Sequence, residues 1–357
     1  MKILQVIPNL CFGGAEILCE NLTCALKDMG HQVVVVSLYA ERTPISQRME
    51  AAGITIRYLD KKLGLDVSMV PKLRRLFLEE KPDVVHTHLD VIKYAALAAK
   101  LAGVSKCVHT VHSVAEKEAG GPAQKAVNGF YFRHGLSVPV ALSQEIQASI
   151  VRFYGLPAGK VLVIRNGIDL SKCRSKEDYR AGHPVRIVHV GRFDVPKNHP
   201  GLLRAFRLLL EKHPDCRLIL VGDGDSRQEM EALAAELGIA GQVEFCGMQK
   251  DVHPYLYDAD IFVLTSVYEG NPMTILEAMG TGLPIAATAV GGIPDMVTDG
   301  EDALLTSCRD EDIAGALGRL VEDESLRARL GRAAREHSVR FSAQTMAENY
   351  CRVFAGN

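Results

Sequence analysis

The first 38 residues, MKILQVIPNLCFGGAEILCENLTCALKDMGHQVVVVSL, contain one complete strand–helix–strand unit. The run Ile3–Ile7 is apolar except for Gln5 and predicts a buried strand. After the turn at Gly13 and Gly14, apolar residues recur at helical spacing until Gly30, which ends the predicted helix. The β-branched run Val33–Leu38 predicts a second strand. Solidly apolar strands joined by a helix are typical of a parallel sheet covered on both faces.

The same alternation continues along the chain and starts a second time at Val185, after the polar stretch 166–183. We therefore expect an α/β protein of two Rossmann-like domains in tandem, with a ligand cleft between the carboxyl ends of their strands. The expected domains span 1–168 and 185–335, with a linker at 169–184 and a C-terminal helical segment at 336–357 that crosses back to the first domain.

Composition excludes several classes of protein. With 357 residues and 47% hydrophobic side chains, the chain is long enough for two folded domains and too apolar for a disordered protein. The net charge of −2 argues against a surface that binds nucleic acid. This small sum hides a split, because residues 1–180 carry 24 basic and 17 acidic side chains, whereas residues 181–357 carry 17 and 26. The two halves are expected to face different partners, although ordinary solvated surface is an alternative explanation.

Cysteine usage and hydropathy favour a cytoplasmic protein. Nine cysteines, an odd number, are scattered without a CxxC pair, which predicts reduced thiols rather than disulfides or a zinc site. No run approaches the roughly 18 apolar residues that a membrane-spanning helix needs. We expect a cytoplasmic protein that can still lie against the inner face of a membrane.

Neither a nicotinamide cofactor nor a P-loop fits the glycine-rich turns. The first turn is not GxGxxG, the second strand lacks the acidic residue that holds a ribose, and Gly222–Gly224 is only a GxG fragment. No GxxxxGK[ST] sequence occurs. The turn at Gly13 and Gly14 still allows backbone amides to approach an anion, or it serves only as a tight turn.

The segment Tyr268–Gly280, YEGNPMTILEAMG, carries the most information about chemistry. Asn271 is predicted as the N-cap and Pro272 as the first residue of a helix, whose free amides would face a phosphate. Glu269 precedes this helix and Glu277 lies about two turns inside it, so their carboxylates can accept hydrogen bonds from sugar hydroxyls. The alternative is that Glu269 is an ordinary loop residue and Glu277 a solvated helix residue. The apolar neighbours of Glu277 argue against this, because an unpaired carboxylate among them would be costly.

These residues resemble a known family. Glu269 and Glu277 form the E-x7-E element of retaining glycosyltransferases with the GT-B fold, and the chain is similar to family 4 of these enzymes over nearly its whole length. The motifs that carry the resemblance are Gly13–Glu16, Asp83–His88, Thr110–His112, Val163–Asp169, Val190–Phe193 with Lys197, Glu269–Pro284 and Gly291–Asp295.

The resemblance implies a role for each domain and for particular residues. It makes the first domain the acceptor-binding one and the second the nucleotide-sugar-binding one. Arg192 and Lys197 would neutralise the diphosphate, Glu277 would hold the ribose and Glu269 the donor sugar. His112 would orient the reacting sugar. The backbone positions implied to contact substrate are Gly13, Gly14, Gly191, Gly270, Asn271, Pro272 and Met273, and Asn166 and Thr274 complete the substrate-binding set.

No metal or other cofactor is expected. The histidines at 86, 88, 109 and 112 lack carboxylates at ligand spacing. Asp258-Ala259-Asp260 mimics a metal-binding DxD, but it precedes the predicted strand Ile261–Thr265, where a helix end and turn explain it. The reaction implied by the resemblance is a metal-independent front-face transfer with retention, in which the departing phosphate accepts the acceptor's proton. A sugar-nucleotide epimerase and a non-catalytic two-domain binder of sugar nucleotides are the alternative functions.

The expected partners are a UDP-sugar rather than a GDP-sugar as donor, and a saccharide or lipid-linked acceptor. A basic, amphipathic surface in the first domain would contact an anionic membrane, where a lipid-linked acceptor lies. Ordinary solvated helix faces are the alternative. The residues assigned to this surface are Lys61, Lys62, Lys72, Arg74 and Arg75. The run Phe130–His134 also mixes aromatic side chains with positive charge.

Overall fold

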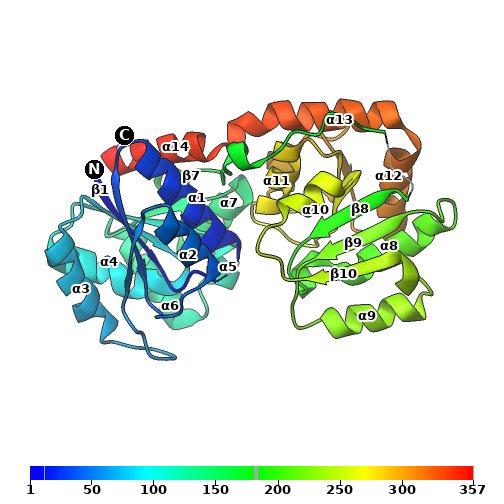
Figure 1. Cartoon of the computed structure of the whole chain (residues 1–357). Helices are drawn as coiled ribbons and strands as arrows, with labels where there is room; N and C mark the ends of the chain where they lie inside the picture. The colour runs from blue at the N-terminus through cyan, green and yellow to red at the C-terminus, as the bar shows by residue number, and fades with distance from the viewer. Residues whose placement is uncertain (12, 181–183, 357) are drawn as a thin grey trace. The chain divides into compact units, whose positions relative to one another are not determined.

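The computed structural model describes residues 1–11, 13–180 and 184–356 and divides the chain into two compact units (Figure 1). Unit 1 comprises Met1–Ile168 and Ala343–Asn357, and unit 2 comprises Asp169–Ser342. Each unit contains one parallel sheet with helices packed on it, so the expected α/β class with two Rossmann-like sheets is confirmed.

Unit 1 has a seven-stranded sheet in the order β3-β2-β1-β4-β5-β6-β7, and every recorded pairing is parallel. The strands are β1 (Lys2–Ile7), β2 (Gln32–Ser37), β3 (Thr55–Tyr58), β4 (Val84–His88), β5 (Lys106–Val111), β6 (Val138–Ala141) and β7 (Leu162–Val163). The helices are α1 (Gly14–Asp28), α2 (Pro44–Ala51), α3 (Met69–Glu80), α4 (Ile92–Ala102), α5 (Ala115–Glu118), α6 (Pro122–Arg133), α7 (Gln144–Tyr154) and α14 (Ala343–Ala355).

Unit 2 has a six-stranded parallel sheet in the order β10-β9-β8-β11-β12-β13. The strands are β8 (Arg186–Val190), β9 (Arg217–Val221), β10 (Val243–Gly247), β11 (Ile261–Leu264), β12 (Ile285–Thr288) and β13 (Leu304–Thr306). The helices are α8 (His199–Leu210), α9 (Arg227–Glu236), α10 (His253–Asp258), α11 (Met273–Thr281), α12 (Asp310–Glu322) and α13 (Glu324–His337). Short 3₁₀ helices in the two units span Leu89–Val91, Ala158–Lys160, Leu170–Lys172, Val195–Lys197, Ala240–Gln242, Ile293–Asp295 and Ser338–Phe341.

The segment expected to link the domains is packed against unit 2 where the structure describes it. Lys176 N donates to Thr281 O at 2.8 Å, and Tyr179 Oη donates to Gly282 O at 3.0 Å. Tyr179 is buried. Residues 181–183 of the predicted linker lie outside the described residues.

The last helix, α14, packs beside α1 (Figure 1). Tyr350 is completely buried, and its hydroxyl lies 2.7 Å from Thr110 Oγ1 at the end of β5. Residues 343–355 therefore contribute to the core of unit 1, whereas the preceding residues 336–342, expected in the same C-terminal segment, belong to unit 2.

In each sheet the strand order reverses at one point, between β1 and β4 in unit 1 and between β8 and β11 in unit 2. Ligands of open parallel sheets bind beyond the carboxyl ends of the strands at such a point. Gly13 and Gly14 follow β1, Arg192 and Lys197 follow β8, and Glu269 follows β11. Most of the predicted site residues are thus at the edges where this fold binds ligands.

Candidate active site

Lys197 and Glu269, predicted from separate motifs, form an ion pair in unit 2. Lys197 Nζ lies 2.5 Å from Glu269 Oε1, and Ser266 Oγ donates to the same oxygen at 2.6 Å. Glu269 is buried, and less than a fifth of the Lys197 side chain is exposed. A buried carboxylate with two donors is oriented and its charge is balanced. Sequence reasoning missed Ser266, although its position three residues before Glu269 is a visible signal.

The backbone of Glu269 is held by the loop that follows β12. Gly292 N donates to Glu269 O at 3.1 Å. Gly291 has a φ of +58°, and a Cβ there would overlap the carbonyl oxygen of Glu269. Glycine is therefore required at 291 by its backbone conformation and by this close approach. The Gly291–Asp295 motif, noted only as a resemblance, thus positions the loop that carries Glu269.

Helix α11 begins one residue later than predicted. Met273 is its first residue and Pro272 is the N-cap, with an extended ψ of 122°, so the prediction of Asn271 as N-cap is wrong. Because proline has no N–H, Pro272 cannot donate to a substrate, and the free amides begin at Met273. Thr274 Oγ1 is buried and has no hydrogen-bond partner among the described residues. Asn271 is buried beside this helix start.

Glu277 differs from Glu269 in its surroundings. Its side chain is half-buried, and its carboxylate makes no hydrogen bond or ion pair with the described part of the chain. Burial and, second, the charge of Asp251 raise the pKa of Glu277 to about 7. The carboxylate is thus available to accept hydrogen bonds from a ligand, and its charge would be stabilised by ligand hydroxyls.

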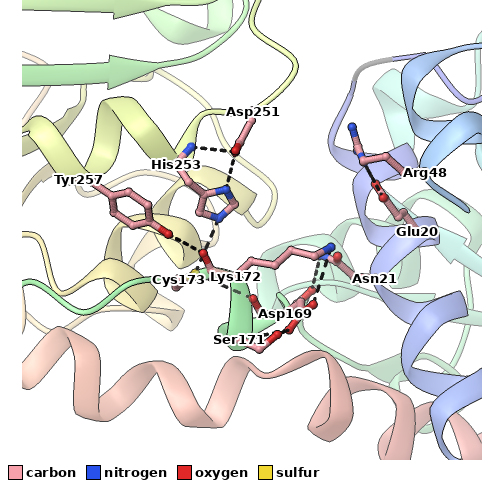
Figure 2. Close-up of polar contacts among 11 residues, drawn as sticks. Glu20, Asn21, Arg48, Asp169, Ser171, Lys172, Cys173, Asp251, His253 and Tyr257 are labelled. Atoms are coloured by element: carbon pink, nitrogen blue, oxygen red, sulfur yellow. Dashed lines mark hydrogen bonds and ion pairs between the residues drawn. The ribbon is translucent and has the colours of Figure 1, made fainter. Parts of the chain in front are cut away.

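A polar cluster missed by sequence reasoning lies in unit 2 (Figure 2). Asp251 Oδ1 accepts from His253 N at 3.0 Å and lies 2.6 Å from His253 Nδ1. His253 Nε2 faces Cys173 Sγ at 3.9 Å, and Tyr257 Oη donates to Lys172 O at 2.6 Å. Burial and, second, the charge of Glu277 raise the pKa of the Cys173 thiol to about 12, so this thiol stays protonated. The cluster fixes the segment before β8 against α10.

Arg192 and Gly191 lie in the turn after β8. The Arg192 side chain is exposed and makes no hydrogen bond or ion pair with described residues. Gly191 N donates to Val221 O at 3.0 Å, and Phe193 N donates to Asp223 O at 3.0 Å. The turn is thus held by its backbone while the guanidinium is free to contact an anionic ligand.

In unit 1, His112 follows β5 and is held through its main chain. The carboxylate oxygen Glu118 Oε2 accepts from His112 N at 2.6 Å and from Ser113 N at 3.0 Å. His112 Nε2 lies 3.1 Å from Nδ1 of the buried His88. Burial lowers the pKa of His112 to about 4, so the ring is neutral at pH 7.

Glu16, the last residue of the Gly13–Glu16 motif, is a buried acid in the first turn of the helix that follows β1. Gly14 begins α1, and Gly13 is its N-cap. Glu16 folds back over this turn, where a Cβ on Gly13 would overlap Glu16 Oε2. Burial raises the pKa of Glu16 to about 7. Asn166, also predicted as a site residue, is buried in unit 1 just after β7.

The metal-like sequences have structural roles. Asp260 is buried, and its Oδ2 accepts from Arg186 N at 2.9 Å, which fixes the start of β8. Asp258 ends α10, as expected for a helix end. Over residues 1–11, 13–180 and 184–356 there is no group of three or more metal-ligating side chains.

Two parallel Rossmann-like sheets, with Glu269 and Glu277 flanking a helix start in the second, define the GT-B class of glycosyltransferase. Residues 12–172 match the family model described as Glycosyltransferase Family 4, and residues 174–337 match the one described as Glycosyl transferases group 1. The chain is a glycosyltransferase and belongs to family 4 of these enzymes, as the sequence motifs predicted.

Individual relatives agree with this assignment. The UDP-Gal:alpha-D-GlcNAc-diphosphoundecaprenol alpha-1,3-galactosyltransferase of Escherichia coli is 29% identical over 276 residues, which cover 72% of this chain and 71% of that protein. An uncharacterized glycosyltransferase of Methanocaldococcus jannaschii is 27% identical, with 90% of each chain covered. The structure of Anabaena HepE with UDP and glucose superposes with a TM-score of 0.88 at 21% identity, covering 100% of both chains.

Proposed function

We propose that this glycosyltransferase moves a sugar, with retention of configuration, from a UDP-sugar to a saccharide or lipid-linked acceptor in glycan or polysaccharide biosynthesis. The observation that carries the proposal is the Lys197–Glu269 pair next to the start of α11, with the unpaired carboxylate of Glu277 further along the helix. These groups supply the cation, helix amides and carboxylates that a nucleoside diphosphate sugar requires.

Each residue has a distinct role in the proposed reaction. Lys197 and Arg192 neutralise the charge that develops on the leaving diphosphate, so a metal ion is not needed. Glu269 accepts hydrogen bonds from the donor sugar, and Glu277 accepts them from the ribose. Unit 2 is then the donor-binding domain and unit 1 the acceptor-binding domain.

The reaction is proposed to take the front-face route. The acceptor oxygen bonds to the anomeric carbon on the face from which the diphosphate departs. The electron pair of the broken bond remains on the diphosphate, whose oxygen receives the acceptor's proton. Within unit 2, Glu269 is already paired with Lys197 and Ser266, which supports a binding role for it rather than attack as a nucleophile.

UDP is favoured over GDP on the basis of related proteins. The Escherichia coli relative is named for UDP-Gal, and Anabaena HepE has been crystallised with UDP-glucose as well as with UDP and glucose. Titration calorimetry with UDP-, GDP- and ADP-sugars tests this choice, and tighter binding of a GDP-sugar would refute it.

An assay of donor consumption with and without acceptors tests the reaction itself. We expect sugar transfer to saccharide or polyprenyl-diphosphate-linked acceptors, with the α configuration of an α-linked donor kept in the product by NMR. Conversion of the donor to an isomer without acceptor would indicate an epimerase. Binding without any turnover would indicate a non-catalytic binder.

We also propose that unit 1 contacts an anionic membrane. The loop between β3 and α3 exposes Leu63, Leu65 and Val67 at 91%, 76% and 74% of their surfaces. Lys62 before them and Lys72 after them are also exposed. Apolar side chains beside exposed cations are typical of proteins that bind peripherally to anionic lipid. The protein would then act at the cytoplasmic face of the membrane, where a lipid-linked acceptor lies.

One part of the predicted basic surface is wrong. Lys61 is buried, and its Nζ donates to Gly64 O at 2.6 Å and to Tyr39 Oη at 3.1 Å, so it holds the loop together instead of facing lipid. In the helix segment, Arg74 and Arg75 are exposed, which leaves the other assigned cations available. Among the described residues, no helix combines the length and the apolar character that a membrane span needs.

Co-sedimentation with vesicles of phosphatidylglycerol and phosphatidylcholine tests the membrane proposal. A triple change of Leu63, Leu65 and Val67 to Ser should weaken binding to the anionic vesicles, and so should Ser at Lys72, Arg74 and Arg75. Ser at the exposed Leu101 in α4 is the control. Binding that is unchanged in both triple variants would refute the proposal.

A further inference from the structure

Behind His112 lies a chain of buried hydrogen bonds that no role described above uses. Gln5, in the middle of β1, is completely buried, and its Oε1 lies 2.9 Å from His88 Nε2. His88, the last residue of β4, is also completely buried, and its Nδ1 lies 3.1 Å from His112 Nε2. His112 is the member of this chain that remains partly exposed.

The hydrogen bonds from Gln5 through His88 to His112 determine which ring nitrogens of the two histidines carry a proton. An amide oxygen only accepts, so His88 donates to Gln5 from Nε2. Burial holds the pKa of His88 well below its usual range, so the ring carries one proton and its Nδ1 has a free lone pair. His112 must then donate to His88 from Nε2. Because His112 is neutral as well, its Nδ1 is left without a proton.

We propose that Gln5 and His88 are positioning residues that hold His112 in the Nε2–H tautomer, so that its Nδ1 accepts a hydrogen bond from a hydroxyl of the bound sugar. This inference rests on the proposed sugar transfer and on the role that the family resemblance implies for His112, orienting the reacting sugar, but the tautomer itself is a property of unit 1. Glu118, which accepts from the main chain of His112 and Ser113, fixes the backbone so that only the ring's protonation remains to be set.

Orienting a sugar requires that the ring nitrogen of His112 facing it keeps one hydrogen-bonding role, and these hydrogen bonds meet that requirement. A neutral imidazole that is free to exchange tautomers would present an acceptor in one form and a donor in the other. A sugar hydroxyl can satisfy both, but its oxygen and hydrogen would then point differently, and the reacting sugar would lose a defined orientation. Two completely buried side chains remove this choice before the substrate binds.

Nitrogen-15 NMR of protein labelled in the histidine rings tests the tautomer directly, and the signal lost in His112→Gln identifies His112. At pH 7 we expect a protonated Nε2 and an unprotonated Nδ1 in both His112 and His88. A proton on Nδ1 of His112 would overturn the proposal, because it would mean that the Gln5 amide is turned to donate. This readout does not depend on activity, so it also decides the inference if the protein turns over no sugar nucleotide.

Substitutions along the chain test its effect on turnover. Gln5→Met keeps the shape but removes the acceptor, so the tautomers of His88 and His112 should mix and kcat should fall roughly 10-fold with the donor KM little changed. His88→Asn keeps an acceptor near the position of Nδ1 and should retain the Nε2–H tautomer of His112, whereas His88→Leu should not.

Tyr350→Phe is the matched control. This substitution removes a hydroxyl that bonds to Thr110 in the same buried region. Tyr350 is not one of the residues that connect Gln5 to His112 by hydrogen bonds. We expect it to lower the melting temperature without changing the ring signals of His112 or the ratio of kcat to donor KM. Signals of His112 that shift equally in Tyr350→Phe and Gln5→Met would show only general loosening and would refute the positioning role.

Discussion

At the residue scale, Glu277 is proposed to bind the donor, and its ionised carboxyl lowers the stability of the folded protein. Its pKa in the folded protein is raised to about 7 from an ordinary value of 4.5, by burial first and by Asp251 second. A carboxyl whose pKa is raised on folding is favoured in its protonated form. The fold is therefore most stable with respect to this group below pH 4.5, and that advantage is lost as the pH rises toward 7.

Glu277→Gln should therefore stabilise the protein at pH 8 and change it little at pH 4.5. We expect a gain of roughly 1–3 kcal/mol in the free energy of unfolding at pH 8, together with a loss of at least ~10-fold in donor affinity. Urea unfolding at the two pH values and calorimetry with UDP measure the two effects. Glu177→Gln, in the exposed part of unit 2, is the control. Normal donor kinetics in Glu277→Gln or Glu277→Ala would remove the site assignment.

Lys197 differs from Glu277 because its charge is already paired, with Glu269, before any donor binds. Lys197→Met leaves the buried carboxylate of Glu269 without its cation, so both stability and turnover should fall. We expect kcat to fall by about 10²-fold, since the fixed charge at the leaving diphosphate is lost. Steady-state kinetics and thermal unfolding test this prediction, with Met at the exposed Lys212 as the control. A variant with lowered stability but unchanged kcat would assign the pair a structural role only.

At the scale of elements, the start of α11 depends on two loops that touch. Gly291, after β12, approaches the backbone of Glu269, after β11, so closely that no side chain fits. The contact between these two loops positions the first turn of α11 and the carboxylate of Glu269. No local sequence pattern around Glu269 predicts this contact.

Gly291→Ala tests this contact against a matched control. Gly291 and Gly300 both have positive φ, +58° and +71°, but a Cβ at Gly300 would meet nothing within 4 Å. Gly300→Ala should cost only the backbone strain, about 1 kcal/mol, whereas Gly291→Ala should cost roughly 2–4 kcal/mol and also reduce donor binding. Equal losses in the two variants, measured by urea unfolding and calorimetry, would contradict the proposed contact.

The elements also show where sequence patterns succeed. Buried central strands such as β2 and β11 are solidly apolar and were predicted to within a residue. Strand β3 was not predicted, because it is a short edge strand with half-exposed residues and no strong pattern. Strand β6 contains Pro139 and helix α6 has few buried residues, so both were also missed.

At the scale of the whole molecule, the two units differ in how much of the chain each needs. Unit 2 is one continuous segment, Asp169–Ser342, whereas unit 1 needs α14 from the end of the chain. The acidic half of the sequence forms most of unit 2, so the anionic donor proposed to bind there would be held by local groups, Lys197, Arg192 and helix amides, against the overall charge.

Separate expression of the units tests this difference. Residues 169–342 should fold alone and bind UDP, because their sheet and core are complete. Residues 1–168 should be destabilised by several kcal/mol, since the buried α14 residues Tyr350, Met346 and Phe354 would be missing from their core. Circular dichroism melting and UDP calorimetry provide the readouts. A segment 1–168 as stable as the full chain would contradict the structural role of α14.

The sequence by itself determined the fold class, the family and the identity of most candidate site residues, because buried parallel strands and ligand-binding loops leave local patterns of apolar runs, glycines and charges. Only the tertiary structure decided how those residues are connected. Lys197 and its partner Glu269 are 72 positions apart in the sequence, and Glu277 is 26 positions from Asp251, whose charge contributes to its raised pKa. The hydrogen bonds from Gln5 through His88 to His112 connect residues that are 107 positions apart. Distances and burial of this kind depend on strand order, which brings distant loops to one sheet edge.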